Sequence, residues 1–168
     1  MEDTFKKCVA VAENAKVPLN PTIDQTSNVF MWQNNLLKFY MENDIDKAII
    51  YGRELREEHG EILAKQDQND LKFSLATSYA LKGDLSTFDE VKAIFEDCVE
   101  NMPPEQTGFV LNNLGMWHFF NFIKQSSELK DPSGAGLDAI QPIIDNYEEA
   151  VFNLKRSVRT FELFELAF

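Results

Sequence analysis

The side chains that most often serve catalysis or metal binding are few in this sequence and lie far apart. The two histidines, His59 and His118, and the two cysteines, Cys8 and Cys98, occupy four separate segments. A zinc site or a catalytic pair usually places such residues at short fixed spacings, and no such spacing occurs here. We therefore expect His118 and Cys98 to be packed side chains, because each takes a position that suits packing. His59 ends the charged stretch Arg53–His59, which we interpret as a solvated helix surface.

Other chemistry-bearing patterns are incomplete. Ser133–Gly136 is rich in glycine, but neither a preceding strand nor a following Lys-Ser/Thr accompanies it, so it is not a phosphate loop. Glu57-Glu58 and Glu148-Glu149 would point to different faces of a helix and cannot form an acid/base pair. The stretch 67–78 lacks the glycine and the closing glutamate of a calcium loop. The sequence thus predicts no catalytic residue, no metal and no cofactor, and we expect a protein that is not an enzyme.

The elements that would position any site are all expected to be helices. Between the breaks, apolar residues recur at helical spacing, as in Leu71, Leu75 and Tyr79, and no segment alternates over the length of a strand. Helix ends are expected where glycine and proline occur, at Val17–Pro21, Gly60, Gly83–Asp84, Met102–Pro104 and Asp131–Gly134. The sequence predicts an all-α chain of about seven helices.

Composition limits the classes of partner. The chain has 168 residues and a formal net charge of −12, so it should repel phosphate backbones and anionic lipid. We expect no nucleic-acid partner and no direct membrane span, since the longest apolar runs are far shorter than a bilayer requires. The acidic surface suits a basic partner or serves solubility alone. Two distant cysteines and a start that resembles no secretory signal indicate an intracellular setting, the cytoplasm first and the mitochondrion as the alternative.

Small and aromatic residues recur at similar spacing in three successive helix pairs. The first pair carries Trp32, Leu36, Phe39 and Ala48, with a turn at Asn43–Lys47. The second pair carries Leu75, Ala76, Tyr79, Gly83, Val91, Phe95, Cys98 and Pro103. The third pair carries Leu111, Leu114, Gly115 and His118, and then Asn146, Tyr147, Ala150, Leu154 and Ser157. These patterns resemble the tetratricopeptide repeat (TPR), in which two antiparallel helices span about 34 residues.

The resemblance implies a TPR-like helical-hairpin solenoid with an interrupted third repeat. We expect an N-terminal helix and linker at 1–28 and the TPR-like domain at 29–168, with repeats at about 29–62, 68–104 and 108–161. In the third repeat, Gly115 and Ala150 stand much farther apart than the family spacing, which indicates an insertion at 123–145. It should lengthen the front helix past Phe122, break at Asp131-Pro132 and re-enter through a turn at Ile140–Ile144.

The front helices of TPR domains line a concave groove that often holds a partner peptide, and the resemblance implies the same here. The partner-binding residues would be Asn34, Asn112, Asn113, Met116 and Phe119. The alternative for the asparagines is bonding to neighbouring helix backbones. TPR domains that hold an acidic tail carry Lys and Arg in this groove, whereas these residues are neutral or apolar. The expected ligand is therefore an apolar or basic segment of a partner protein.

Two functions fit this sequence. The first is a non-catalytic scaffold or adaptor for protein–protein interaction. The second is a permanent structural subunit of a large complex, with a mitochondrial complex among the candidates. Extra docking surface would come from the insertion, from the aromatic run Trp117–Phe122 and from the apolar end Phe161–Phe168, which either docks on something or continues into further chain.

Overall fold

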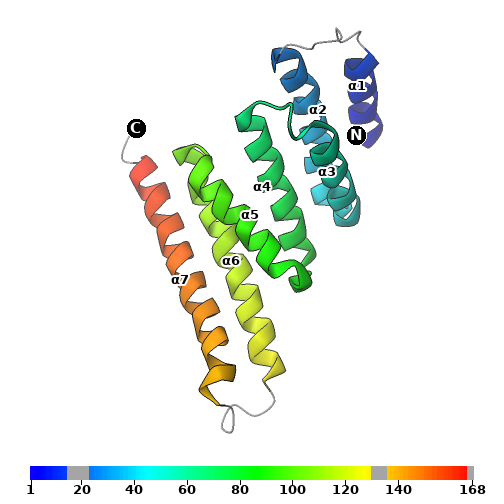
Figure 1. The fold of residues 1–168 in the computed structure, drawn as a ribbon. Helices are drawn as coiled ribbons and strands as arrows, with labels where there is room; N and C mark the ends of the chain where they lie inside the picture. The colour runs from blue at the N-terminus through cyan, green and yellow to red at the C-terminus, as the bar shows by residue number, and fades with distance from the viewer. Residues whose placement is uncertain (15–22, 130–135, 166–168) are drawn as a thin grey trace. The chain divides into compact units, whose positions relative to one another are not determined.

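The computed structural model describes residues 1–14, 23–129 and 136–165, and within these ranges it contains seven α-helices and no strand (Figure 1). The predicted all-α class and helix number are confirmed. The chain forms two compact units, Met1–Lys82 and Gly83–Phe168. The boundary lies inside the second expected repeat, between its front and back helices, so the TPR-like solenoid stays a prediction. The expected breaks at Val17–Pro21 and Asp131–Gly134 fall outside the described residues.

The first unit consists of α1 (Glu2–Asn14), α2 (Ile23–Asn43), α3 (Ile45–His59) and α4 (Lys65–Lys82). Its apolar core is made by side chains from all four helices and from the turn that precedes α4. The core residues are Val9, Phe30, Leu36, Leu37, Tyr40, Ala48, Leu55, Leu63 and Leu71. The N-terminal helix α1 packs on this core through Phe5 and Val9. It therefore belongs to the same unit as the first expected repeat.

Helix ends follow the expected signals. Asp44 separates α2 from α3, and its side-chain oxygen accepts a hydrogen bond from the Lys47 backbone N–H at 3.2 Å. This cap satisfies one of the N–H groups that a helix start leaves unpaired. Gly83 follows α4 with φ of 70°, a left-handed conformation in which a β-carbon is strained. The expected turns at Asn43–Lys47 and Gly83 are thus confirmed.

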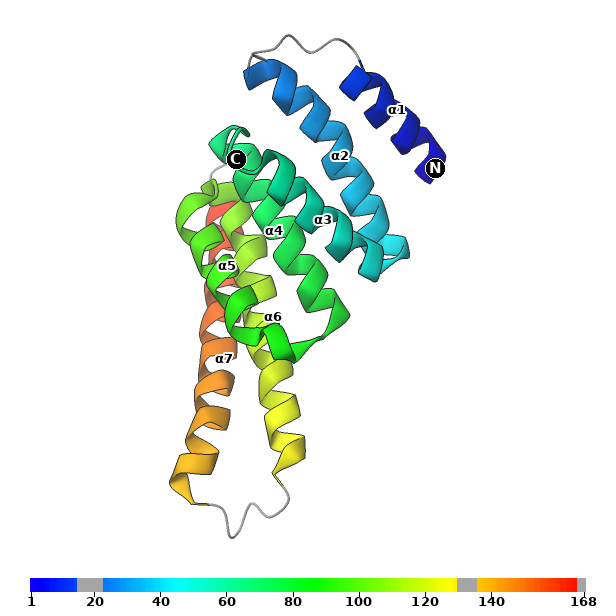
Figure 2. The ribbon, with the colours of Figure 1, turned by 45° about the vertical axis from the view of Figure 1, so that its right-hand side comes forward.

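The second unit contains a 3-10 turn, η1 (Leu85–Thr87), followed by α5 (Phe88–Asn101), α6 (Pro104–Glu128) and α7 (Leu137–Glu165). The 3-10 turn occupies most of the sequence between Gly83 and α5. Helix α6 begins with Pro104, which is tolerated because the first turn has no intrahelical partner for its N–H. Helices α6 and α7 form a long hairpin whose lower part, with the connection between the two helices, extends beyond the start of α5 (Figures 1 and 2).

Two glycines let α6 and α7 approach closely. A β-carbon on Gly115 would lie 2.8 Å from Leu154 Cγ and 3.1 Å from the Leu154 backbone nitrogen. One on Gly108 would lie 3.0 Å from the Phe161 ring. At the same level the Ser157 hydroxyl donates a 2.8 Å hydrogen bond to the Gly108 carbonyl. Gly108 and Gly115 stand two turns apart, so they form one small-residue face into which α7 packs.

The insertion differs from the prediction in one respect. As expected, α6 continues past Phe122, to Glu128. The expected turn at Ile140–Ile144 is wrong, because α7 begins at Leu137 and runs through Pro142 without a break. Pro142 lies near the start of this helix, where it removes a single bond, the one to the Asp138 carbonyl. Asp138 is exposed, so water can satisfy that carbonyl, and the helix continues.

The apolar C-terminal pattern continues α7 to Glu165. Phe161 is half-buried against Gly108, and its ring meets that of Phe109 edge-on with centroids 5.0 Å apart. Leu163 is exposed. The side chains of residues 164–168 lie outside the described part of the chain, so the expectation of a docking C-terminus stays a prediction.

Replacing Gly115 with valine should destabilise the second unit by about 2 kcal/mol, because the added carbons overlap both the side chain and the backbone of Leu154. Urea denaturation followed by circular dichroism measures the loss. Asn112→Val is the matched control, since Asn112 is exposed on the same helix and asparagine and valine have similar helix propensities. Equal stability of the two variants would contradict the close approach.

Candidate functional site

Helix α6 has one buried side and one partly exposed side. The buried side faces α5 and α7 and carries Val110, Leu111, Leu114, Gly115, Trp117, His118 and Asn121. From Phe109 to Ile123, the other side carries residues spaced three or four apart, which places them on a single face of the helix. We call this face the α6 stripe; it consists of Phe109, Asn112, Asn113, Met116, Phe119, Phe120 and Ile123.

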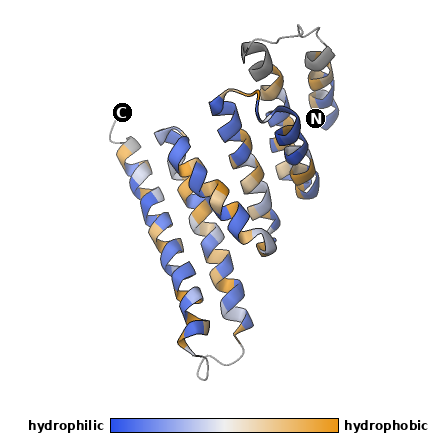
Figure 3. Ribbon diagram, viewed as in Figure 1, coloured by the Kyte–Doolittle hydropathy of each residue, from blue (hydrophilic) through white to orange (hydrophobic). Residues whose placement is uncertain are grey.

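The α6 stripe is uncharged, mostly apolar and partly open to solvent. Phe109 is 58% exposed, Phe120 42% and Ile123 47%, while Met116 and Phe119 are half-buried. Figure 3 shows apolar residues distributed along α6. Rings continue sideways from the stripe: Phe119 stacks on Phe122 with centroids 6.0 Å apart, and Phe122 meets Tyr147 of α7 at 5.4 Å. Single exposed apolar residues are ordinary, but a continuous row of this kind is typical of an interaction surface.

The structure brings four of the five predicted partner-binding residues together. Asn112, Asn113, Met116 and Phe119 all lie on the α6 stripe, where Asn112 is exposed and the others are half-buried. Asn34 belongs to the first unit and is only 8% exposed. Its side-chain oxygen accepts a 3.4 Å hydrogen bond from the Ser74 hydroxyl, which is also buried. Asn34 is thus inside its unit, away from the solvent-exposed surface.

Sequence reasoning did not name Phe109, and it gave Phe120 and Ile123 only as parts of the aromatic run and the insertion that would add docking surface, not as groove residues. A usable signal was present, since Phe109, Met116 and Ile123 follow one another at seven-residue intervals, and Phe120 stands four after Met116. Such a row marks one face of a long helix. The same spacing fits a buried face equally well, so the sequence could not show that this face is left uncovered.

Trp117 and His118 anchor the buried side of α6. The Trp117 indole N–H donates to the Phe88 carbonyl at 3.1 Å, and the two rings stack at 5.8 Å. His118, which is 3% exposed, meets the Phe88 ring edge-on at 5.3 Å. Both residues therefore connect α6 with the start of α5. The predicted packing role of His118 is confirmed.

A series of hydrogen bonds determines which ring nitrogen of His118 carries a proton. The Asn146 side-chain N–H group donates to Gln125 Oε1 at 3.1 Å and to the Pro142 carbonyl at 2.9 Å. Its oxygen therefore faces His118, whose Nδ1–H donates to it at 3.0 Å. Nδ1 carries the proton in this arrangement. These hydrogen bonds join α6 to α7, and none of the groups in them is a nucleophile that His118 could activate.

The remaining candidates for chemistry have structural surroundings. Cys98 is fully buried in the second unit, as predicted for a packed thiol. The charged residues before His59 are exposed, as predicted for a solvated helix surface. His59 itself is half-buried, and its Nε2 lies 3.3 Å from Gln33 Nε2 because the end of α3 folds back on α2. Among the described residues, no group of three or more His, Cys, Asp or Glu side chains could hold a metal ion. Within the same ranges, no helix has the length and apolar content needed to cross a bilayer.

No family model, curated protein or solved structure was found to match this chain. The resemblance to the tetratricopeptide repeat therefore continues to depend on the sequence motifs, and the role of the α6 stripe has to be argued from its own chemistry.

His118 should make the stability of the protein depend on pH. Burial lowers its pKa below the ordinary value of 6.5, and Lys92 lowers it further, while the bond to Asn146 and the charges of Glu149 and Glu96 act in the opposite direction. Because the folded pKa is lower than the unfolded one, the unfolded state binds the extra proton first. The stabilising contribution is complete above the unfolded pKa and decreases as the pH falls through it.

We expect the free energy of unfolding of the wild type to fall between about pH 7.5 and pH 5.5 more than that of His118→Gln. Urea denaturation at both pH values measures the two slopes. The variant will be less stable at every pH, because it loses the contact with Phe88. The test is therefore how much the free energy of unfolding changes with pH in each protein, not its value at one pH. Equal slopes would show that His118 is accessible to protons in the folded protein.

Proposed function

We propose that this protein is a non-catalytic scaffold or adaptor that binds a partner protein through the α6 stripe. The observation that carries the proposal is the uncharged row of partly exposed aromatic and aliphatic side chains on one face of α6. Aromatic residues and methionine are enriched in the buried centres of protein interfaces, whereas charged residues are depleted there. The composition of the stripe has this character.

The asparagines suit an extended or helical segment of the partner. Asn112 is exposed, and its amide can both donate to and accept from a main chain laid along the stripe. The apolar residues on either side would supply the burial that holds the segment. Since the stripe has no cation with which to pair an acidic tail, the favoured segment is apolar, in agreement with the departure from acidic-tail binders noted in the sequence.

A permanent structural subunit of a large complex is the second candidate. It is favoured by the part of the α6–α7 hairpin that extends beyond α5 (Figure 2). On this part, apolar residues stay exposed although a stable monomer would gain by covering them. Besides Ile123 of the stripe, they are Leu137, Ile144 and Tyr147. A subunit buried on several sides would use this extension as a second interface.

The experiment introduces Phe120→Ser and Ile123→Ser together into a tagged copy expressed in the protein's own cells. A partner held through the stripe should be lost, so the variant should migrate near the 19.3 kDa of the chain while the wild type migrates in a larger particle. Native mass measurement at low and high salt reads this directly. Because the stripe is uncharged, a particle held through it should persist at high salt, which screens only charges; a small particle then indicates an adaptor and a particle of many subunits a permanent subunit.

Ile62→Ser is the matched control, because Ile62 is 56% exposed in the first unit and distant in sequence from the stripe. It should leave the particle intact. Circular dichroism of the purified variants establishes that they fold. A wild-type chain that migrates alone, or a double variant that keeps its particle, would overturn the proposal.

A further inference from the structure

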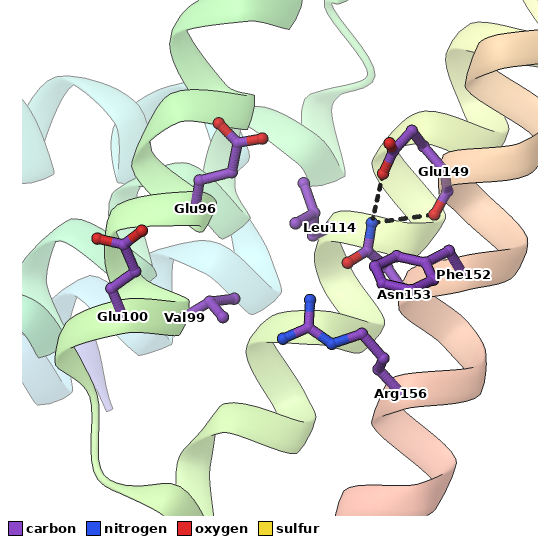
Figure 4. A pocket seen from close by; sticks show the side chains of 8 residues that line it. All are labelled: Glu96, Val99, Glu100, Leu114, Glu149, Phe152, Asn153 and Arg156. Atoms are coloured by element: carbon purple, nitrogen blue, oxygen red, sulfur yellow. Dashed lines mark hydrogen bonds between the residues drawn. The ribbon is translucent and has the colours of Figure 1, made fainter.

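A separate pocket opens between α5 and α7 on the second unit. It has a volume of about 370 Å³, and its floor is Leu114 of α6 (Figure 4). Glu96, Val99 and Glu100 of α5 line one side, and Glu149, Phe152, Asn153 and Arg156 of α7 line the other. Leu114 points away from the α6 stripe, since it is on the buried side of that helix. The pocket is therefore a different surface from the one proposed above.

The walls of the pocket carry more negative than positive charge. The lining contains three glutamates and one arginine. Glu96 Oε1 lies 3.8 Å from Lys92 Nζ, which partly balances its charge. Glu100 makes no hydrogen bond or ion pair with any residue that the structure describes. The guanidinium of Arg156 lies over the Phe152 ring, 5.3 Å from its centroid, on the same side of the pocket as Asn153 (Figure 4). Glu96 and Glu100 of α5 lie across the pocket from it and leave the lining with an excess of carboxylates.

Asn153 adds a second, independent feature. It is 3% exposed, and its N–H group donates to the Glu149 carbonyl at 2.9 Å and to the Glu149 carboxylate at 3.4 Å. This fixes the orientation of the amide, so its oxygen points the other way, into the pocket (Figure 4). In the described structure that oxygen accepts no hydrogen bond. Asn153 Oδ1 is not among the fully buried polar atoms that lack a partner, so solvent reaches it through the pocket and a guest that donates a hydrogen bond can replace that water.

We propose that this pocket holds an arginine or lysine side chain from a segment of a partner protein. The stem of that side chain would lie on Leu114 and Val99, and its head would donate to Asn153 Oδ1 and pair with Glu100 and Glu149. Apart from Arg156, the polar side chains that line the pocket are three carboxylates and the Asn153 amide, whose oxygen faces the pocket. All of them present hydrogen-bond acceptors, so the pocket favours a cationic donor over an anion. The inference rests on the proposed function only for the source of the cation.

The experiment titrates the full chain, labelled with 15N, with Nα-acetyl-arginine N-methylamide. The control probe is the citrulline analogue, which has nearly the same shape but no charge. We expect the arginine probe to shift the backbone amide signals of residues 96–100 and 149–156 and to bind at least about fivefold more tightly than the citrulline probe. Equal binding of both probes, or shifts confined to other residues, would overturn the proposal.

Variants locate the charge. The pair Glu100→Gln and Glu149→Gln should weaken the arginine probe by about fivefold to tenfold, because each exposed ion pair contributes a factor of a few. The Glu149→Gln change keeps a side-chain oxygen that can accept from Asn153, so the pocket keeps its shape. Glu90→Gln is the matched control, an exposed glutamate of α5 that does not line the pocket, and it should have no effect. Unchanged affinity in the double variant would contradict the assignment.

A titration with spermidine tests the alternative source of positive charge. A partner segment predicts weaker binding of spermidine than of the arginine probe at these residues, and tighter binding of spermidine would identify a polyamine site and overturn the proposal. None of these measurements involves the α6 stripe. A negative result for the pocket therefore does not affect the proposed function of the α6 stripe. A negative result for the stripe likewise does not affect the pocket.

Discussion

The second unit depends on the contact between Gly115 and Leu154, where the absence of a side chain allows two helices to meet almost backbone to backbone. Gly108 repeats the device two turns earlier, where Ser157 and Phe161 of α7 fill the space. Because α7 lies so close, the side of α6 that faces it must be filled by well-fitted buried residues, such as Leu114 and His118. The opposite side of α6 is then left with no helix of its own unit to cover it.

This division explains why two different surfaces arise from one helix. The α6 stripe is uncharged and presents rings, so it suits a partner that buries apolar groups. The pocket lies across α6 from the stripe, between α5 and α7, and its chemistry comes from carboxylates and one fixed amide oxygen. A partner could engage both surfaces only by wrapping around the hairpin. Two partners, or two segments of one partner, are the simpler arrangement.

Much of the fold follows from local signals. Asp44 and Gly83 mark helix ends because their side-chain chemistry or φ is needed there. The turn expected at Ile140–Ile144 is absent because α7 starts at Leu137, and a proline as near to the helix start as Pro142 does not break it. Asn34 and Asn112 show the limit for the site. Both are asparagines of front helices that were expected to face the groove, yet one is buried beside Ser74 and the other is exposed. Only the packing of neighbouring helices separates them, and that is a long-range property.

The α6 stripe should be open to solvent in the isolated chain and covered when the chain is bound to its partner in the cell. Carbene footprinting read by mass spectrometry measures this at single residues, on the purified chain and on the native particle. The account predicts that Phe120, Ile123 and Met116 are labelled in the purified chain and protected in the particle, whereas the exposed Ile62 is labelled in both. Equal labelling of the stripe in the two samples would contradict it.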